Sequence, residues 1–149
     1  MKIILASDRA GAELRDRLAV YLSEEGYTVE NVTDPALQID YPDAADYLCI
    51  RVANGQFDRG ILVCGSGIGM SIAANKHRGI RAGVAADEYS ARMATIHNNA
   101  NVLCLGARTT GFEKAFGLAD AFLTAEFSAG ERHLRRLDKI AKLEQESLK

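Results

Sequence analysis

The amino-acid sequence predicts an α/β fold, namely a doubly wound, Rossmann-like sheet of five parallel strands with an extra helix at the C-terminus. Short apolar runs alternate five times with longer segments of helical period. Four of these runs are almost continuously apolar, which is typical of strands buried on both faces of a sheet. Repeated strand–helix alternation favours right-handed crossovers, which make the strands parallel. We expect residues 1–149 to form a single domain, because the sequence contains no linker, repeat or low-complexity tract.

The boundaries of the elements follow from the apolar runs and their spacing. Strands are expected at residues 3–7, 28–32, 59–64, 81–85 and 102–105. Helices are expected at residues 68–76, 87–98 and 112–125, and two earlier helical faces are formed by Leu14, Leu18, Tyr21 and Leu22 and by Ala44, Tyr47, Leu48 and Val52. Gly26 is placed to end the first helix, and Asp87 to cap the fourth. The charged segment 129–149 is predicted to form a last amphipathic helix that either covers its own sheet or reaches a second subunit.

The composition argues against several classes of protein. A net charge of −2 gives no overall attraction to nucleic acid or to an anionic membrane. The three cysteines form no Cys-x-x-Cys pair, so neither a disulfide framework nor a zinc site is expected, and a reducing compartment is favoured. The N-terminal apolar run is too short for a signal peptide or a membrane-spanning helix. We therefore expect a cytoplasmic protein that binds neither nucleic acid nor membranes.

Polar and glycine residues follow the predicted strands, where an open α/β sheet binds its ligands. Asp8 and Arg9 follow the first strand, and the loop Cys64-Gly-Ser-Gly-Ile-Gly69 follows the third. This loop leads into a helix, so its backbone amides and the helix dipole form a potential anion site. The spacing G-x-G-x-G matches neither the dinucleotide fingerprint nor a Walker phosphate loop. By itself, the loop fits a structural turn as well as it fits an anion site.

Cys64 makes the functional interpretation of this loop the stronger one. A cysteine at the end of a strand, just before a helix N-terminus, experiences a field that favours the thiolate. The neighbouring amides are placed to hold an oxyanion while the sulfur removes a proton. Such an arrangement suits proton abstraction next to a carbonyl group. Cys49 and Cys104 are interpreted as small buried apolar residues.

His97 and Asn98 lie at the predicted end of the fourth helix. A helix C-terminus favours a protonated imidazole, so His97 is a candidate general acid. The alternative is that the histidine merely ends the helix, with Asn98 and Asn99 forming its cap and turn.

Several arginines are candidates for binding a phosphate. Arg132 and Arg136 are four residues apart on the predicted last helix, a spacing that can hold one phosphate between two guanidinium groups, although charged terminal helices are often only solvated. Arg108 follows the fifth strand. Tyr41, at the start of the second helix, is placed either to line a pocket or to staple the helix start.

Four motifs resemble those of ribose-5-phosphate isomerase type B, whose wider family includes the galactose-6-phosphate isomerase subunits. The motifs are Asp40-Tyr-Pro42, the block from Cys64 to Lys76, His97-Asn-Asn-Ala-Asn101 and Arg132-His-Leu-Arg-Arg136. The similarity extends from Lys2 to about Ile140. One branch of this family has a glutamate just after the glycine loop, and here that position is Met70, so the chain resembles the cysteine type.

The resemblance implies a homodimer or a dimer of dimers, with each active site built from two subunits, and an enediolate mechanism on a sugar phosphate without metal or cofactor. Cys64 would move the proton between C1 and C2. The amides around Gly65, Ser66, Gly67 and Gly69 would hold the enediolate, with Ser66 supplying the loop hydroxyl. His97 would open the furanose ring together with Asp8, Asn98 would contact the enediolate, and Arg108, Arg132 and Arg136 would bind the phosphate.

Arg9 departs from the family pattern, which has Asp-His after the first strand. A histidine exchanges protons near neutral pH and an arginine does not. If this position contacts only the phosphate, Arg9 is an acceptable substitute. If it shapes the sugar pocket, a different substrate is expected.

Three functions follow from these observations. The first is interconversion of ribose 5-phosphate and ribulose 5-phosphate. The second is the same chemistry on a tetrose, galactose or allose phosphate. The third is a nucleotide-binding regulatory module, which needs a ribose-binding acid about 20 residues beyond the glycine loop, where Asp87 and Glu88 lie.

Overall fold

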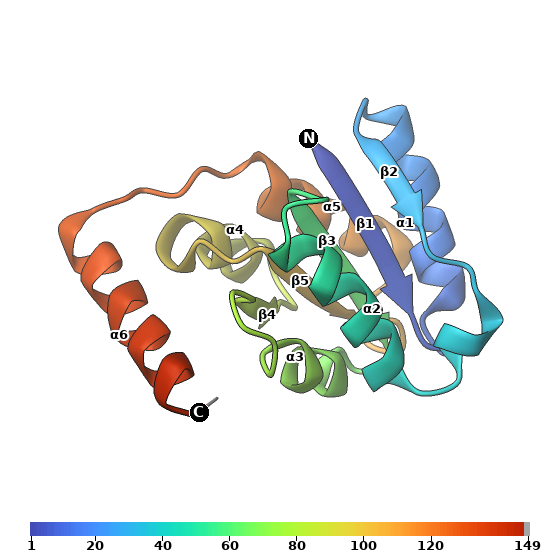
Figure 1. Cartoon of the computed structure of the whole chain (residues 1–149). Coiled ribbons are helices and arrows are strands. Elements are labelled where there is room, and N and C mark those ends of the chain that lie inside the picture. The colour runs from blue at the N-terminus through green and yellow to red at the C-terminus, as the bar shows by residue number, and fades with distance from the viewer. Residues whose placement is uncertain (148–149) are drawn as a thin grey trace.

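The chain forms a five-stranded parallel sheet in the order β2-β1-β3-β5-β4, with helices on both faces (Figure 1). This computed structural model describes residues 1–147. The strands are β1 Lys2–Ser7, β2 Thr28–Asn31, β3 Arg59–Cys64, β4 Ala82–Val84 and β5 Val102–Gly106. The helices are α1 Ala12–Glu24, α2 Tyr41–Ala53, α3 Ile68–Ala74, α4 Glu88–Asn98, α5 Phe112–Thr124 and α6 Glu131–Ser147, with a short 3-10 helix at Pro35–Gln38.

The two faces of the sheet have separate apolar cores. Helices α1, α4 and α5 pack on one face, where Leu18 and Phe122 are fully buried. Helices α2 and α3 pack on the other face, where Leu48 and Met70 are fully buried. Strands β1, β3 and β5 contribute alternate residues to both cores, which explains their continuous apolar runs. The predicted doubly wound parallel sheet is confirmed.

The predicted boundaries are correct to within one or two residues. Gly26 has a φ of +95°, a left-handed conformation that ends α1. Asp87 caps α4, because its Oδ1 atom accepts a hydrogen bond from the backbone N–H of Ser90 at 2.7 Å. Strand β4 is shorter than predicted, because the N–H of Arg81 donates to the side chain of Asn101 instead of to a neighbouring strand.

The strand order reverses between β1 and β3, which lie side by side in the middle of the sheet. The chain leaves β1 toward one edge and returns through α2 to build the other half. In open α/β sheets the connections at such a point diverge and leave a crevice beyond the carboxyl ends of the strands. The loops after Ser7 and Cys64 both lie there.

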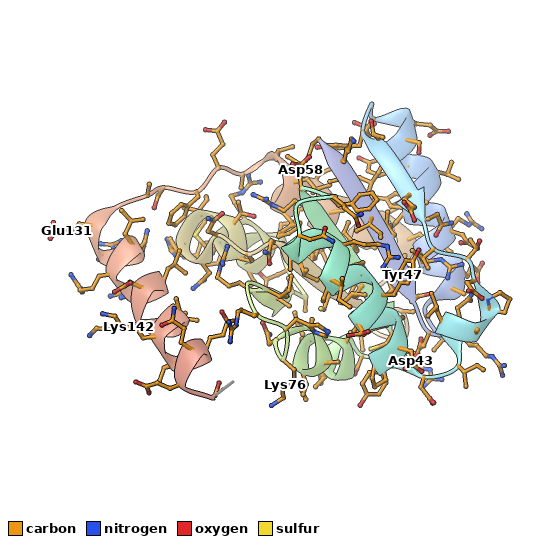
Figure 2. All side chains as sticks on the ribbon, in the orientation of Figure 1. Asp43, Tyr47, Asp58, Lys76, Glu131 and Lys142 are labelled. Atoms are coloured by element: carbon orange, nitrogen blue, oxygen red, sulfur yellow. The ribbon has the colours of Figure 1, made fainter. Side chains whose placement is uncertain are left out.

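Helix α6 is separated from the layered body by the extended segment 125–130 (Figure 1). Glu131 and Lys142 lie on the side of α6 that faces away from the rest of the chain (Figure 2). Three large apolar side chains of α6 are exposed, namely Leu134, Ile140 and Leu143. Within residues 1–147, no helix combines the length and the apolar character needed to cross a membrane.

Candidate active site

The glycine loop after β3 folds back on the sulfur of Cys64. The backbone N–H of Gly67 donates to the Sγ atom at 3.2 Å, and this side chain is only 5% exposed. Gly67 adopts a φ of +80°, which other residues reach only with strain. An N–H donor directed at sulfur stabilises negative charge on it. The loop therefore places a backbone N–H donor at the Cys64 sulfur.

The loop after β5 supports the glycine loop. The carbonyl oxygen of Cys64 accepts from the N–H of Ala107 at 2.8 Å, and that of Gly65 accepts from the N–H of Arg108 at 3.0 Å. The guanidinium of Arg108 lies over the glycine loop, since a Cβ atom on Gly65 would be 3.3 Å from its Nη1 atom. The hydroxyl of Ser66 accepts from the N–H of Ile68 at 3.3 Å. A cationic group and an exposed hydroxyl thus lie beside the sulfur-bearing loop.

Tyr41 covers the other end of the loop. A Cβ atom on Gly69 would come within 2.8 Å of the Tyr41 ring, so the glycine makes room for the aromatic side chain. Tyr41 is also the first residue of α2. The residue therefore both begins this helix and packs its ring on the end of the glycine loop.

Asp8 and Arg9 lie next to the same loop, at the carboxyl end of β1. The N–H of Asp8 donates to the carbonyl oxygen of Val63 at 3.3 Å, and its Oδ1 atom accepts from the N–H of Gly11 at 3.0 Å. Gly11 packs against Val63 closely enough to leave no space for a Cβ atom. The N–H of Arg9 donates to the carbonyl oxygen of Gln38, and its side chain is exposed. We call these residues the carboxyl-end cluster, which comprises Asp8, Arg9, Tyr41, Cys64, Gly65, Ser66, Gly67, Gly69 and Arg108.

The remaining predicted site residues form a second group around the end of α4, namely His97, Asn98, Arg132 and Arg136. Together with His133, which was not predicted, we call them the amino-end cluster. The rings of His97 and His133 stack at 4.5 Å between centroids, tilted by 40°. Arg81, just before β4, donates from its guanidinium to the carbonyl oxygens of Asn98 and Asn99, which ties this group to the amino ends of the strands.

Within one chain the two clusters lie at opposite ends of the sheet. Cys64 is level with Gly106 at the end of β5, whereas Gly60 is level with Val102 at its start. Four residues of strand span about 13 Å. Helix α4 ends just before Val102, so His97 lies near the amino end of the sheet, away from Cys64 at its carboxyl end. The structure therefore does not bring Cys64 and His97 together in one copy of the chain.

The other two cysteines differ from Cys64 in environment. Cys49 and Cys104 are fully buried. Burial raises the pKa of Cys49 to about 12, and it raises the pKa of Cys104 well above its usual range. Both remain neutral thiols at physiological pH, and their interpretation as buried apolar residues is confirmed.

Two polar residues near these clusters are buried, although their burial was not predicted from the sequence. Arg15 is 2% exposed and donates to the hydroxyl of Ser7 at 2.9 Å, which fixes the end of β1. Glu13, Asp16 and Arg17 around it are charged, so the local pattern resembles a solvated face. His133 is buried on an otherwise exposed helix. Its spacing from Leu137 and Ile140, four and seven residues on, is the signal that would have placed it on the apolar face.

Comparison with known proteins agrees with the fold and with the motifs. Residues 3–140 match the sequence model of the family described as Ribose/Galactose Isomerase. The chain is 41% identical over 145 residues to ribose-5-phosphate isomerase B of Escherichia coli K12, covering 97% of each chain. It is 43% identical over 132 residues to D-erythrulose-4-phosphate isomerase of Pectobacterium atrosepticum, covering 87% of each.

Among solved structures, the fold is similar to that of ribose-5-phosphate isomerase B from Mycoplasma genitalium with bound ribulose 5-phosphate. The TM-score is 0.90, the identity is 38%, and 97% of each chain is covered. The nucleotide-binding alternative loses its support, because Asp87 is engaged as a helix cap. The motifs at Cys64 and His97 and the match over residues 3–140 show that this chain belongs to the ribose/galactose isomerase family.

Proposed function

We propose that this protein interconverts ribose 5-phosphate and ribulose 5-phosphate, with Cys64 as the base. The observation that carries the proposal is the hydrogen bond from the Gly67 N–H to the Cys64 sulfur, at the carboxyl end of β3 in a sheet of this family. Its curated relative from E. coli is a ribose-5-phosphate isomerase, and its structural neighbour from M. genitalium holds ribulose 5-phosphate. The three unpaired cysteines favour the cytoplasm as its location.

In the proposed reaction the thiolate of Cys64 removes the proton from C2 of the open-chain aldose. Charge then develops on the oxygen atoms of an enediolate, where the amides of Gly65, Ser66 and Gly69 and the Ser66 hydroxyl are positioned to donate hydrogen bonds. A proton passes from O2 to O1 of the enediolate, and the thiol returns its proton to C1, which gives the ketose. No oxidant or second substrate is needed, because the atoms of aldose and ketose balance.

The other residues have supporting roles in this proposal. His97 protonates the ring oxygen when the furanose opens, and Asp8 accepts the proton of the C1 hydroxyl. Asn98 donates to the enediolate. Arg108, Arg132 and Arg136 bind the phosphate, for which a guanidinium is well suited because it donates two parallel hydrogen bonds. Tyr41 closes the pocket over the glycine loop.

We further propose that each active site uses the carboxyl-end cluster of one copy and the amino-end cluster of a second copy. A cavity of about 730 Å³ lies between α6 and the body, lined by Ile80, Ala82, Asn98, Ile140 and Leu143 among others. On α3, directly after the glycine loop, Ile68 and Ile72 are 57% and 58% exposed. Docking of α3 from a partner copy into this cavity would cover these apolar side chains and carry Cys64 toward Asn98 and His97. Two-fold symmetry repeats the contact and makes two such sites.

A panel of four- to six-carbon sugar phosphates tests the substrate. We expect kcat/KM to be highest for ribose 5-phosphate and at least about tenfold lower for tetrose and hexose phosphates. The reason is that only a substrate of the right length places its phosphate at the arginines and its reacting carbons at Cys64 at the same time. A higher kcat/KM for the four-carbon substrate would favour the second candidate, which rests on the exposed Arg9 and on the erythrulose-phosphate relative. Turnover of none of these compounds would refute the proposed function.

A further inference from the structure

His133 is the buried residue of α6 within the part of that helix that the structure describes. It is 7% exposed, whereas its neighbours Arg132 and Leu134 are exposed. Its imidazole packs against α4 and the connecting segment, so it anchors the start of α6 to the body. None of the roles proposed above uses it.

The hydrogen bonds of His133 determine where its proton lies. The Nε atom of Arg132 lies 3.3 Å from Nε2 of His133, and an arginine only donates hydrogen bonds. The Nε2 atom must therefore carry a lone pair. The Nδ1 atom lies 2.6 Å from the hydroxyl oxygen of Ser128, so it carries the proton and donates it to this oxygen. Both nitrogens are then satisfied in a neutral ring.

Ser128 in turn is fixed to α4. Its backbone N–H donates to the carbonyl oxygen of Ile96 at 3.1 Å, one residue before His97. The ring of His97 lies against that of His133 at 4.5 Å. The side chains of His97, Ser128 and His133 thus form one packed unit, to which Arg132 is joined by its Nε atom.

The surroundings of His133 oppose its protonation. Burial lowers the pKa of His133, and the positive charges of His97, when protonated, Arg132 and Arg136 lower it further. Ser128 is uncharged, so no carboxylate among these partners offsets the repulsion. A proton on Nε2 would also face the Arg132 donor and break that hydrogen bond.

We propose that His133 is a positioning residue, which as a neutral ring protonated on Nδ1 holds the His97 ring on one side and orients the Arg132 guanidinium on the other. The Nη atoms of Arg132, which make no hydrogen bond within residues 1–147, then point to a phosphate as their partner. One residue thereby sets the relative placement of the group assigned to ring opening and a group assigned to phosphate binding. The catalytic role of His133 rests on the proposed function, whereas its tautomer and its contacts do not depend on that function.

Nitrogen NMR of the labelled full-length protein tests the tautomer without any substrate. The chain has three histidines, so the ring signals can be assigned by comparison with His133→Gln. Near neutral pH, Nδ1 of His133 is expected at the protonated position and Nε2 at the unprotonated one. A proton on Nε2, or an imidazolium at neutral pH, would overturn the proposal. This result is independent of whether ribose 5-phosphate is the substrate.

Three substitutions separate positioning from a merely structural role. His133→Phe keeps a ring but loses both hydrogen bonds, and we expect KM to rise about tenfold with a smaller fall in kcat, because the charged Arg132 guanidinium loses the acceptor that orients it. In His133→Gln the amide oxygen replaces Nε2 as acceptor for Arg132, so KM should stay within about threefold of wild type. His133→Asn keeps the donor to Ser128 but not the acceptor, so its KM should rise as in His133→Phe.

Glu131→Gln, on the outer side of α6, is the matched control and should leave both constants unchanged (Figure 2). If His133→Phe and His133→Asn lower only the melting temperature and leave KM at the wild-type value, His133 is structural and the proposal is wrong. Equal KM values for His133→Gln and His133→Asn would likewise contradict the assigned acceptor role of Nε2.

Discussion

Replacing Cys64 by alanine is expected to lower kcat by at least about 10³-fold, since a positioned general base contributes roughly 10²- to 10⁴-fold and no second base takes its place. The change leaves the loop in place, because the bond between the Ala107 N–H and the residue 64 carbonyl is a backbone contact. The phosphate groups are untouched, so the affinity for a non-reacting sugar phosphate should stay within about threefold. Initial rates of ketose formation and calorimetric binding measure the two quantities separately.

Cys49→Ala is the matched control for this experiment. Cys49 is buried in the same core as Cys64, and burial raises its pKa to about 12. Its loss should cost about 1 kcal/mol of unfolding free energy and leave kcat within about twofold of wild type. If Cys64→Ala keeps near-normal kcat, the cysteine is not the base and another group must move the proton.

A second large effect is expected from charges placed on the apolar face of α6. Leu143 is 65% exposed and Ile140 is also exposed, so aspartate at both positions costs little in an isolated chain. In the proposed dimer these side chains face the partner, where burying two unpaired carboxylates costs several kcal/mol. We expect the double variant to be a folded monomer with kcat/KM reduced by at least about 10³-fold, because no single copy brings its two clusters together.

The mass in solution and the far-ultraviolet circular dichroism check this expectation. Val20→Asp is the matched control, because Val20 is an equally exposed apolar residue on α1, away from α6. It should keep the mass and the activity of the wild type. A double variant of Ile140 and Leu143 that is monomeric and fully active would show that one copy suffices for catalysis.

The fold and the carboxyl-end cluster could be predicted because both depend on local patterns. Apolar runs mark buried strands, and the glycines around Cys64 mark a loop whose conformation other residues reach only with strain. The position of Asp8 and Arg9 beside this loop follows from parallel strands, whose carboxyl ends share one edge. Nothing beyond the order of strands and helices is needed for these conclusions.

The placement of His97 at the amino edge of the sheet also follows from the sequence, although we did not predict it. A helix between two parallel strands runs antiparallel to them, so the end of α4 must lie at the amino edge of the sheet, away from Cys64. The burial of Arg15 is different, because it depends on the hydrogen bond from Arg15 to Ser7 at the end of β1, and no spacing within α1 encodes it. The spacing within α6 indicates the face on which His133 lies, but its contact with the His97 ring depends on the tertiary structure.

The most direct test of the two-copy site is to mix two inactive variants, Cys64→Ala and His97→Gln, under conditions that allow the subunits to exchange. In a hybrid dimer one site carries both substitutions and the other carries neither. Equal mixing makes half of the dimers hybrids, so we predict recovery of about a quarter of wild-type activity, as two-fold symmetry requires. If each site lay within one chain, every site of the hybrid would lack one group. No recovery of activity after demonstrated subunit exchange would therefore contradict the shared site.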